Sequence, residues 1–178
     1  LNGSAAILVA RHCGCEKKTI EMAIKSFSPL PHRMEIVGLI NGVTYCNDSK
    51  ATNTGAVIRA LQQAKGRVYL IAGGKDKGED YTLLRSSVAE KVAKLLLIGE
   101  AAELLSETLH DVTDTTFFDT LEEAVIHASS EAGEGDTVLL SPACASFDMF
   151  ESYGHRGQTF RDAVKKVADS QNRETRVT

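Results

Sequence analysis

Three short runs of apolar residues limit what this chain can fold into. The runs cover residues 67–72, 93–98 and 137–140, and helical patterns of about 10–15 residues separate them. This alternation is typical of β-α-β units, in which helices cover both faces of a parallel sheet. The sequence therefore predicts an α/β domain with a doubly wound, mostly parallel, Rossmann-like sheet.

A predicted hairpin adds one antiparallel strand at the edge of that sheet. Apolar residues 36–40 precede an Asn41-Gly42 pair, which favours a tight turn, and Val43 and Tyr45 follow with strand-like spacing. The remaining patterns predict helices over residues 54–64, 81–92, 100–109, 121–132 and 160–168, and a short strand over residues 115–118.

The chain divides at Ser28-Pro29-Leu30-Pro31, because two prolines end a helix and force extended backbone. Residues 1–28 read as two short helical pieces separated by Gly14. No capping or turn residue precedes Leu1, so we expect these residues to be a remnant of a larger domain. Residues 29–170 form the α/β domain, and residues 171–178 are a polar tail.

Charge and hydropathy argue against several classes of partner. The net charge is −4 without a basic block, so we expect no nucleic-acid partner. No apolar run approaches the ~20 residues of a membrane helix, and residues 1–10 lack a signal-peptide pattern. Cys13 and Cys15 beside His12 have poor spacing for a zinc site, so we expect no metal site and reduced thiols in the cytoplasm.

Polar and small residues follow three of the predicted strands. They occupy residues 47–53, 73–78 and 141–148. The carboxyl ends of parallel strands are where α/β proteins bind ligands. Two interpretations of these segments remain open: ligand-binding loops, or ordinary turns and helix caps, with Asp48 or Thr52 capping the helix after the first strand.

The side chains in these loops suit an anionic ligand. Lys50, Thr52, Lys77 and Ser146 can surround a small dianion, while Asp48 and Arg33 can contact a nucleotide-like group. No phosphate-binding G-x-x-x-x-G-K-[ST] motif occurs, so another domain must hold most of any nucleoside triphosphate. Cys144 has no evident partner that would lower its pKa, which argues against a nucleophile.

Four motifs resemble the carboxyl-terminal domain of the Mur ligases of bacterial cell-wall synthesis. They are LPHRME at 30–35, NGVTYCNDSKATN at 41–53, GGKDKG at 73–78 and LLSPACASFDMFESYGHRGQTF at 139–160. They occur in the family's order. NDSKATN together with SPACASFD is similar to the members that add D-glutamate, whereas the sister ligases differ at the second motif.

The resemblance implies an ATP-dependent, amide-forming ligase that adds D-glutamate to UDP-N-acetylmuramoyl-L-alanine through an acyl phosphate. It implies catalytic roles for Lys50, Thr52 and Lys77 around D-glutamate. Ser146 and the backbone at Phe147 and Tyr153 would bind a carboxylate of D-glutamate. Asn2, Arg33 and Asp48 would contact ATP, with Asp48 at the ribose hydroxyls. Lys75 is an alternative to Lys77.

The resemblance also implies that part of the catalytic machinery lies outside this chain. The uridine-binding domain, the phosphate loop and the Mg²⁺ ligands of the family are absent from it. Asn2 with Ala5 and Ala6 resembles the tail of an Asn- and Ala-rich helix in the family's central ATPase domain, so residues 1–28 look like a remnant of that domain. We therefore expect a cytoplasmic, monomeric protein that is inactive as this fragment. The alternatives are a non-catalytic module that binds an amino acid or nucleotide, or a domain like that of folylpolyglutamate synthases.

Overall fold

The computed structural model describes residues 2–27 and 30–174, and the chain divides into two units between Leu30 and Pro31. In the first unit, α1 (Asn2–His12) precedes α2 (Lys17–Ser26), and these helices correspond to the two predicted helical pieces. Leu8, Met22 and Phe27 are exposed in this unit. Ser28 and Pro29 of the predicted boundary lie outside the described residues.

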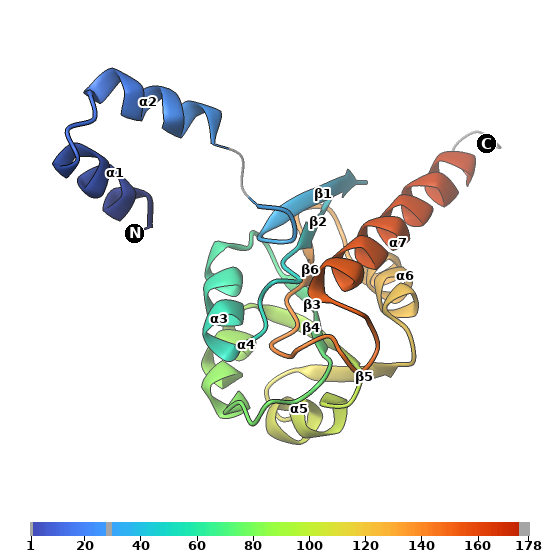
Figure 1. The fold of residues 1–178 in the computed structure, drawn as a ribbon. Helices are drawn as coiled ribbons and strands as arrows, with labels where there is room; N and C mark the ends of the chain where they lie inside the picture. The colour runs from blue at the N-terminus through green and yellow to red at the C-terminus, as the bar shows by residue number, and fades with distance from the viewer. Residues whose placement is uncertain (1, 28–29, 175–178) are drawn as a thin grey trace. The chain divides into compact units, whose positions relative to one another are not determined.

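The second unit is built on a six-stranded sheet (Figure 1). The strands are β1 (Glu35–Ile40), β2 (Val43–Asn47), β3 (Val68–Gly73), β4 (Val92–Ile98), β5 (Asp114–Phe118) and β6 (Thr137–Leu140). Their order is β1-β2-β6-β3-β4-β5. Only β1 and β2 pair antiparallel, and the other neighbours are parallel. The predicted fold class and antiparallel edge strand are confirmed.

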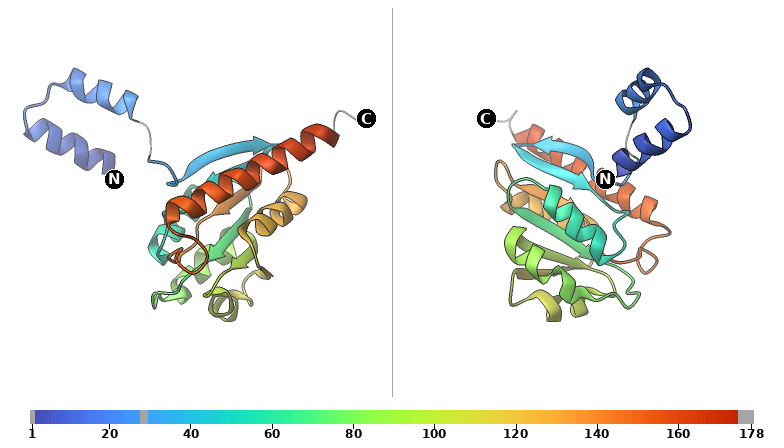
Figure 2. Two further views of the ribbon diagram at one scale, coloured as in Figure 1. Left: turned by 45° about the vertical axis from the view of Figure 1, so that its right-hand side comes forward. Right: turned by 90° about the vertical axis from the view of Figure 1, so that its left-hand side faces the viewer.

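Helices cover both faces of this sheet (Figure 2). One core cluster joins the sheet to α3 (Thr54–Gln63), α4 (Arg85–Lys91) and α5 (Ala102–Leu109), and a second joins it to α6 (Leu121–Glu131) and α7 (Tyr153–Glu174). Along β3, Leu70 packs in the first cluster and Ile71 in the second. Every residue of β3 is buried, which explains why its apolar run is uninterrupted.

The hairpin turn forms where the sequence predicts it. Asn41 and Gly42 both have positive φ, 50° and 78°, as a two-residue turn between twisted strands requires. The turn sets the register in which Ile40 pairs with Val43 and Glu35 pairs with Asn47. It therefore brings the start of β1 beside the end of β2, at the edge where the candidate site lies.

The last helix is longer than predicted. It begins at Tyr153 instead of residue 160 and continues to Glu174, so the proposed polar tail is helical over residues 171–174; residues 175–178 lie outside the described residues. The sequence pattern does not predict the first turns of this helix because they contain Gly154 and Gly157, and glycine is a poor helix former. The structure needs glycine at 157, since a Cβ there would overlap the His32 ring.

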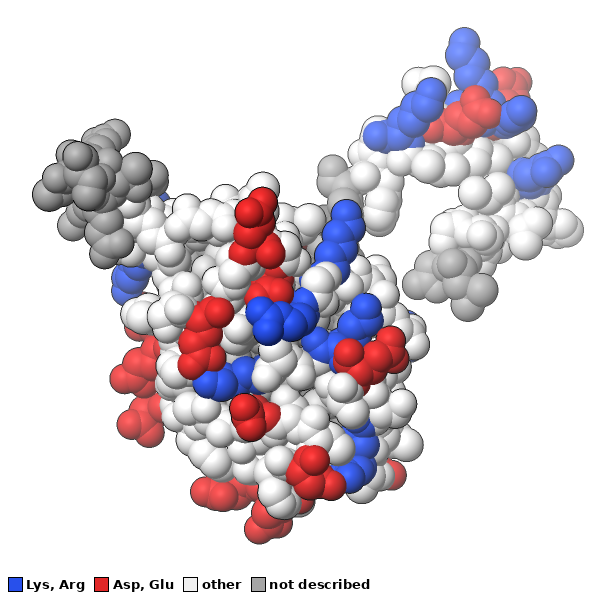
Figure 3. Space-filling view, turned by 180° about the vertical axis from the view of Figure 1, so that it is seen from behind, with Lys and Arg blue, Asp and Glu red and all other residues white. Residues whose placement is uncertain are grey.

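The predicted helix over residues 81–92 is also divided. A 3-10 turn, η1 (Tyr81–Leu84), precedes α4, and Val92 already belongs to β4. No helix in the described ranges, 2–27 and 30–174, is both long and apolar enough to cross a bilayer. On the face that Figure 3 shows, acidic and basic side chains are interspersed over the domain.

Candidate functional site

Three neighbouring strands, β2, β6 and β3, end at one edge of the sheet, and the loops that follow them meet there. We call them the Asp48 loop (residues 48–53), the Lys77 loop (residues 74–80) and the Ser146 loop (residues 141–152). The Asp48 N–H donates to the Leu140 carbonyl at 2.8 Å. Lys75 and Ala145 exchange two backbone hydrogen bonds of 2.9 and 3.1 Å. The topology thus holds all three predicted loops together.

Arg156 is a buried cation beneath these loops, and its role was not apparent from the sequence. Its side chain is 0% exposed. The guanidinium donates to the Ser49 hydroxyl and carbonyl at 3.1 and 3.0 Å, and to the carbonyls of Cys144 and Ala145 at 3.1 and 3.2 Å. Burial lowers the pKa of Arg156 to about 10, so it stays protonated at neutral pH. Arg156 therefore binds the Asp48 loop to the Ser146 loop.

Asp48 is 5% exposed, although it carries an ionisable carboxyl group. Its Oδ1 accepts from the Met34 N–H at 3.1 Å and its Oδ2 from the Ser141 hydroxyl at 3.4 Å. Burial raises the pKa of Asp48 to about 6, against these two hydrogen bonds and the nearby charges of Arg33 and Arg59. Burial disfavours the ionised form of this carboxyl group, and a carboxyl group with a pKa shifted in this way is a candidate for ligand binding.

Arg33 lies in the turn before β1 and its side chain is exposed. The residues on either side of it, His32 and Met34, both have positive φ, 62° and 46°. Backbone in this conformation is uncommon outside glycine and is often retained at ligand sites. Asn47 holds the turn in place, because its side-chain amide lies 3.0 Å from Nδ1 of His32.

Lys50 lies over the Tyr153 ring, with Nζ 3.8 Å from the ring centroid. The backbone of Tyr153 is fixed as well, since its carbonyl accepts from the Ser49 hydroxyl at 2.7 Å. Tyr153 is the first residue of α7, where N–H groups lack helical partners and favour an anion. The Lys50 ammonium therefore lies beside the first residue of α7.

The start of α3 differs from both capping predictions. Neither Asp48 nor Thr52 is the N-cap; Asn53 is, and its side chain accepts from the Ala56 N–H at 2.9 Å. The Thr54 N–H and hydroxyl donate to Glu79 of the Lys77 loop at 3.1 and 3.2 Å. Two N–H groups at this helix start are therefore satisfied by the protein. Thr52 is half-buried beside them.

Asp76 shapes the backbone around Lys77. Its Oδ1 accepts from the Gly78 N–H at 3.1 Å and from the Tyr81 hydroxyl at 2.7 Å. Gly78 has a φ of 76°, which glycine adopts without strain. The Lys77 and Lys75 side chains are exposed, and within residues 2–27 and 30–174 neither ammonium has an ion-pair partner.

The Ser146 loop presents unsatisfied donors. Ser146 is 3% exposed, and its carbonyl accepts from the N–H groups of Met149 and Phe150 at 3.3 and 2.8 Å. Among the described residues its hydroxyl has no hydrogen-bond partner, nor has the Phe147 N–H. The Phe147 side chain is exposed. A nearly buried hydroxyl beside a free N–H is suited to a carboxylate.

Cys144 is not a candidate nucleophile. Burial raises the pKa of Cys144 to about 11, so it remains a thiol at neutral pH. Cys13 and Cys15 are exposed and unpaired. No group of three His, Cys, Asp or Glu side chains in the described part of the chain is arranged to hold a metal ion. The side chain of Asn2 lies outside the described residues.

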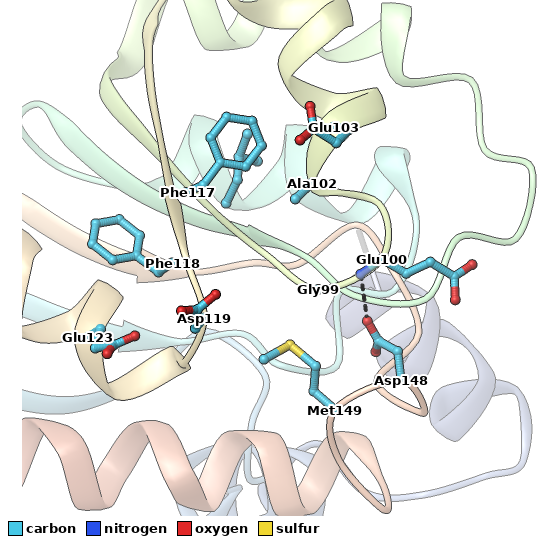
Figure 4. A pocket seen from close by; sticks show the side chains of 11 residues that line it. Gly99, Glu100, Ala102, Glu103, Phe117, Phe118, Asp119, Glu123, Asp148 and Met149 are labelled. Atoms are coloured by element: carbon cyan, nitrogen blue, oxygen red, sulfur yellow. Dashed lines mark hydrogen bonds between the residues drawn. The ribbon is translucent and has the colours of Figure 1, made fainter.

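A pocket of about 700 Å³ lies at the ends of β4 and β5, beside the Ser146 loop (Figure 4). None of the predicted site residues lines it. Its charged lining residues are all acidic: Glu100, Glu103, Asp119, Glu123 and Asp148. Asp148 connects it to the Ser146 loop, since its Oδ2 accepts from the Glu100 N–H at 2.9 Å. This pocket repels an anionic ligand, so the loops themselves remain the candidate site.

Known proteins share this sequence and this fold. The family model described as "Mur ligase, glutamate ligase domain" matches residues 32–144. The UDP-N-acetylmuramoylalanine--D-glutamate ligases of Desulfotalea psychrophila and Bdellovibrio bacteriovorus are 55% and 47% identical, and their matches cover 95% and 93% of this chain. The chain spans only 37% and 36% of the length of these relatives.

Solved structures agree on the fold. E. coli FolC in complex with ADP has a TM-score of 0.65 at 24% identity, covering 96% of this chain and 39% of that one. The UDP-N-acetylmuramate-alanine ligase MurC of Thermotoga maritima has a TM-score of 0.68 at 12% identity, covering 93% and 37%. At such low identity these structures establish a shared fold alone.

Proposed function

The chain belongs to the Mur ligase family, and from that membership we propose that it is the glutamate-binding carboxyl-terminal domain of a longer, ATP-dependent UDP-N-acetylmuramoyl-L-alanine:D-glutamate ligase. Two D-glutamate ligases that match nearly the whole chain, at 55% and 47% identity, support this substrate. The chain's 37% share of the first relative's length supports a domain of a larger enzyme. On this proposal residues 1–28 belong to the central ATPase domain, and the enzyme is monomeric and cytoplasmic.

The single observation that carries the proposal is the convergence of the Lys77 and Ser146 loops. The exchanged hydrogen bonds of Lys75 and Ala145 lie within two residues of Lys77 and one residue of Ser146. An exposed ammonium and a free hydroxyl are thereby brought to one edge of the sheet. We propose that Lys77 binds one carboxylate of D-glutamate, and that Ser146, with the N–H groups of Phe147 and Tyr153, binds the other.

This arrangement serves the proposed reaction by positioning. The carboxylate of UDP-N-acetylmuramoyl-L-alanine takes the γ-phosphoryl group of ATP, leaving ADP and an acyl phosphate. The neutral amine of D-glutamate attacks the acyl carbon, and the tetrahedral intermediate expels phosphate to leave an amide. Two fixed carboxylates leave only the amine free to reach that carbon. Lys50 and Thr52 would face the developing negative charge.

We propose that Arg33 and Asp48 contact the nucleotide, with Asp48 accepting from the ribose hydroxyls. The exposed guanidinium of Arg33 and the retained buried carboxyl of Asp48 support these roles. Asn2 would lie near the adenine. Mg²⁺, when bound with ATP, neutralises phosphate charge, and we propose that its ligands lie mostly in the central domain.

The two alternative functions have less support. A folylpolyglutamate synthase-like domain rests on fold similarity at 24% identity. A non-catalytic binding module would not need to keep Lys50, Thr52, Lys77 and Ser146 together.

Phosphate release by the full-length protein tests the proposal. Release should require ATP, UDP-N-acetylmuramoyl-L-alanine and D-glutamate together, and should fail with L-glutamate or with a folate as acceptor. The 178-residue chain alone should release no phosphate. Glutamate addition to a folate would contradict the proposal.

Two lysine variants test whether Lys77 or Lys75 binds a carboxylate of D-glutamate. Lys77→Met should raise the KM for D-glutamate by about 10- to 150-fold, since a lost bond to a charged group costs about 1.5–3 kcal/mol. Lys75→Met removes the same charge two positions earlier and should change this KM by less than about threefold. The opposite ranking would assign the carboxylate to Lys75.

A further inference from the structure

A hydrogen-bonded chain of three side chains connects the Lys77 loop to the Ser146 loop. The Tyr81 hydroxyl lies 2.7 Å from Oδ1 of Asp76 and 3.1 Å from Sγ of Cys144. Tyr81 is 3% exposed and Cys144 is fully buried. The Tyr81 hydroxyl therefore bonds to one side chain in each of the two loops.

The direction of these bonds follows from their chemistry. The hydrogen bond from Tyr81 is the largest cause that lowers the pKa of Asp76, so the carboxylate is ionised and can only accept. The single phenolic proton therefore points to Asp76. Cys144 must then donate its thiol proton to the phenolic oxygen, because its raised pKa keeps it protonated.

These partners lie one and two residues before the two proposed anchors. Asp76 precedes Lys77 and also accepts from the Gly78 N–H at 3.1 Å, so it contacts the chain on both sides of Lys77. Cys144 lies two residues before Ser146. The backbone bridge between the loops ends at Lys75 and Ala145, before either anchor. The Tyr81 chain is a second link between the two loops, attached one residue after the bridge at Asp76 and one residue before it at Cys144.

We propose that Tyr81 is a positioning residue that holds Lys77 at a set distance from Ser146, and thereby fits the site to the length of a dicarboxylic amino acid. This inference rests on the proposed function. Tyr81 does not touch the ligand; it acts through Asp76. A phenylalanine would fill the same space but leave Asp76 and Lys77 without this link.

Steady-state kinetics of the full-length protein test the proposal with a matched pair of variants. Tyr81→Phe should raise the KM for D-glutamate about tenfold while the KM for ATP and kcat change by less than about twofold, because an anchor used equally in the ground and transition states affects KM. Tyr69→Phe is the control. It also removes one buried phenolic hydrogen bond, to the Glu131 carbonyl at 2.9 Å, from the opposite end of β3.

A double-mutant cycle identifies the partner. Asp76→Ala should raise the same KM, and adding Tyr81→Phe to it should cause little further change, because both variants break one link. Additive effects would show that Tyr81 acts by another route, and would overturn the proposal. An unchanged KM for D-glutamate in Tyr81→Phe would also overturn it while leaving the proposed function intact.

Hydrogen exchange of the full-length protein keeps the two proposals separate. In Tyr81→Phe, amides of residues 74–80 should exchange about tenfold faster than in the wild type, and in Tyr69→Phe they should not. A wild-type protein that does not use D-glutamate would overturn the proposed function, and this exchange experiment would then decide the link by itself. Equal exchange in all three proteins would overturn it.

Discussion

Replacing Asp48 by asparagine should stabilise the folded chain at neutral pH while impairing its proposed function. The pKa of Asp48 is about 6 in the folded state against 3.8 for an ordinary aspartate. A raised folded pKa means that the folded state prefers the proton, so the free energy of unfolding falls as pH rises from about 4 to above 6. At about 1.36 kcal/mol for each pH unit between these values, the full loss is about 3 kcal/mol.

Asparagine keeps the local hydrogen bonds without the charge. Its carbonyl oxygen can accept from the Met34 N–H, and its amide can donate to the Ser141 hydroxyl, where Asp48 now accepts at 3.1 and 3.4 Å. Asp48→Asn should therefore be more stable than the wild type by about 3 kcal/mol at pH 7.5 and by only about 1 kcal/mol at pH 4.5. In the full-length ligase the same variant should lose activity at least about tenfold, because a neutral group binds ribose hydroxyls more weakly.

Urea unfolding followed by circular dichroism at several pH values between 4.5 and 7.5 provides the measurement. The quantity to compare is the difference in unfolding free energy between the wild type and Asp48→Asn, because the titration of all other groups cancels in that difference. Asp111→Asn is the matched control: Asp111 is exposed and paired with Arg85, and its pKa is lowered, so its variant should show a small difference of the opposite sign. A stability difference for Asp48→Asn that is flat with pH, or that increasingly favours the wild type as pH rises, would refute the reasoning.

Three further predictions concern particular contacts. Arg156→Met should lower the free energy of unfolding by about 3–5 kcal/mol, since it leaves buried carbonyls unpaired, whereas Lys166→Met at the exposed ion pair with Glu122 should cost much less; equal shifts in denaturant midpoint would contradict this. Thr120→Ala removes the capping box of α6 and should cost about 1 kcal/mol in the same assay, and no measurable loss would show that the cap is replaced by water. Tyr153→Leu should abolish the upfield NMR shift of the Lys50 ε-methylene protons that Tyr153→Phe retains, and an unshifted methylene in the wild type would rule out the stacked geometry.

Local patterns in the sequence were sufficient to predict the sheet and to group the three loops that form the candidate site. The apolar run of β3 predicted a strand buried on both faces, and Asn41-Gly42 predicted the turn that makes β1 antiparallel. Both follow from periodicity and turn chemistry, which depend on residues close together in the chain. Because parallel strands direct their carboxyl ends to one edge, the loops holding Asp48, Lys77 and Ser146 could be grouped before any coordinates were known.

Tertiary structure alone decided which polar groups bond to one another. Arg156 bonds to Ser49, 107 positions away, and Tyr81 bonds to Cys144, 63 positions away. The start of α3 was predicted with the wrong cap although its signal is local, since Asn53 directly precedes the helix and accepts from the Ala56 N–H; only the added contact from Glu79 to Thr54 depends on the tertiary fold. A buried donor takes whichever acceptor the packed fold brings within reach, and no local pattern specifies that acceptor.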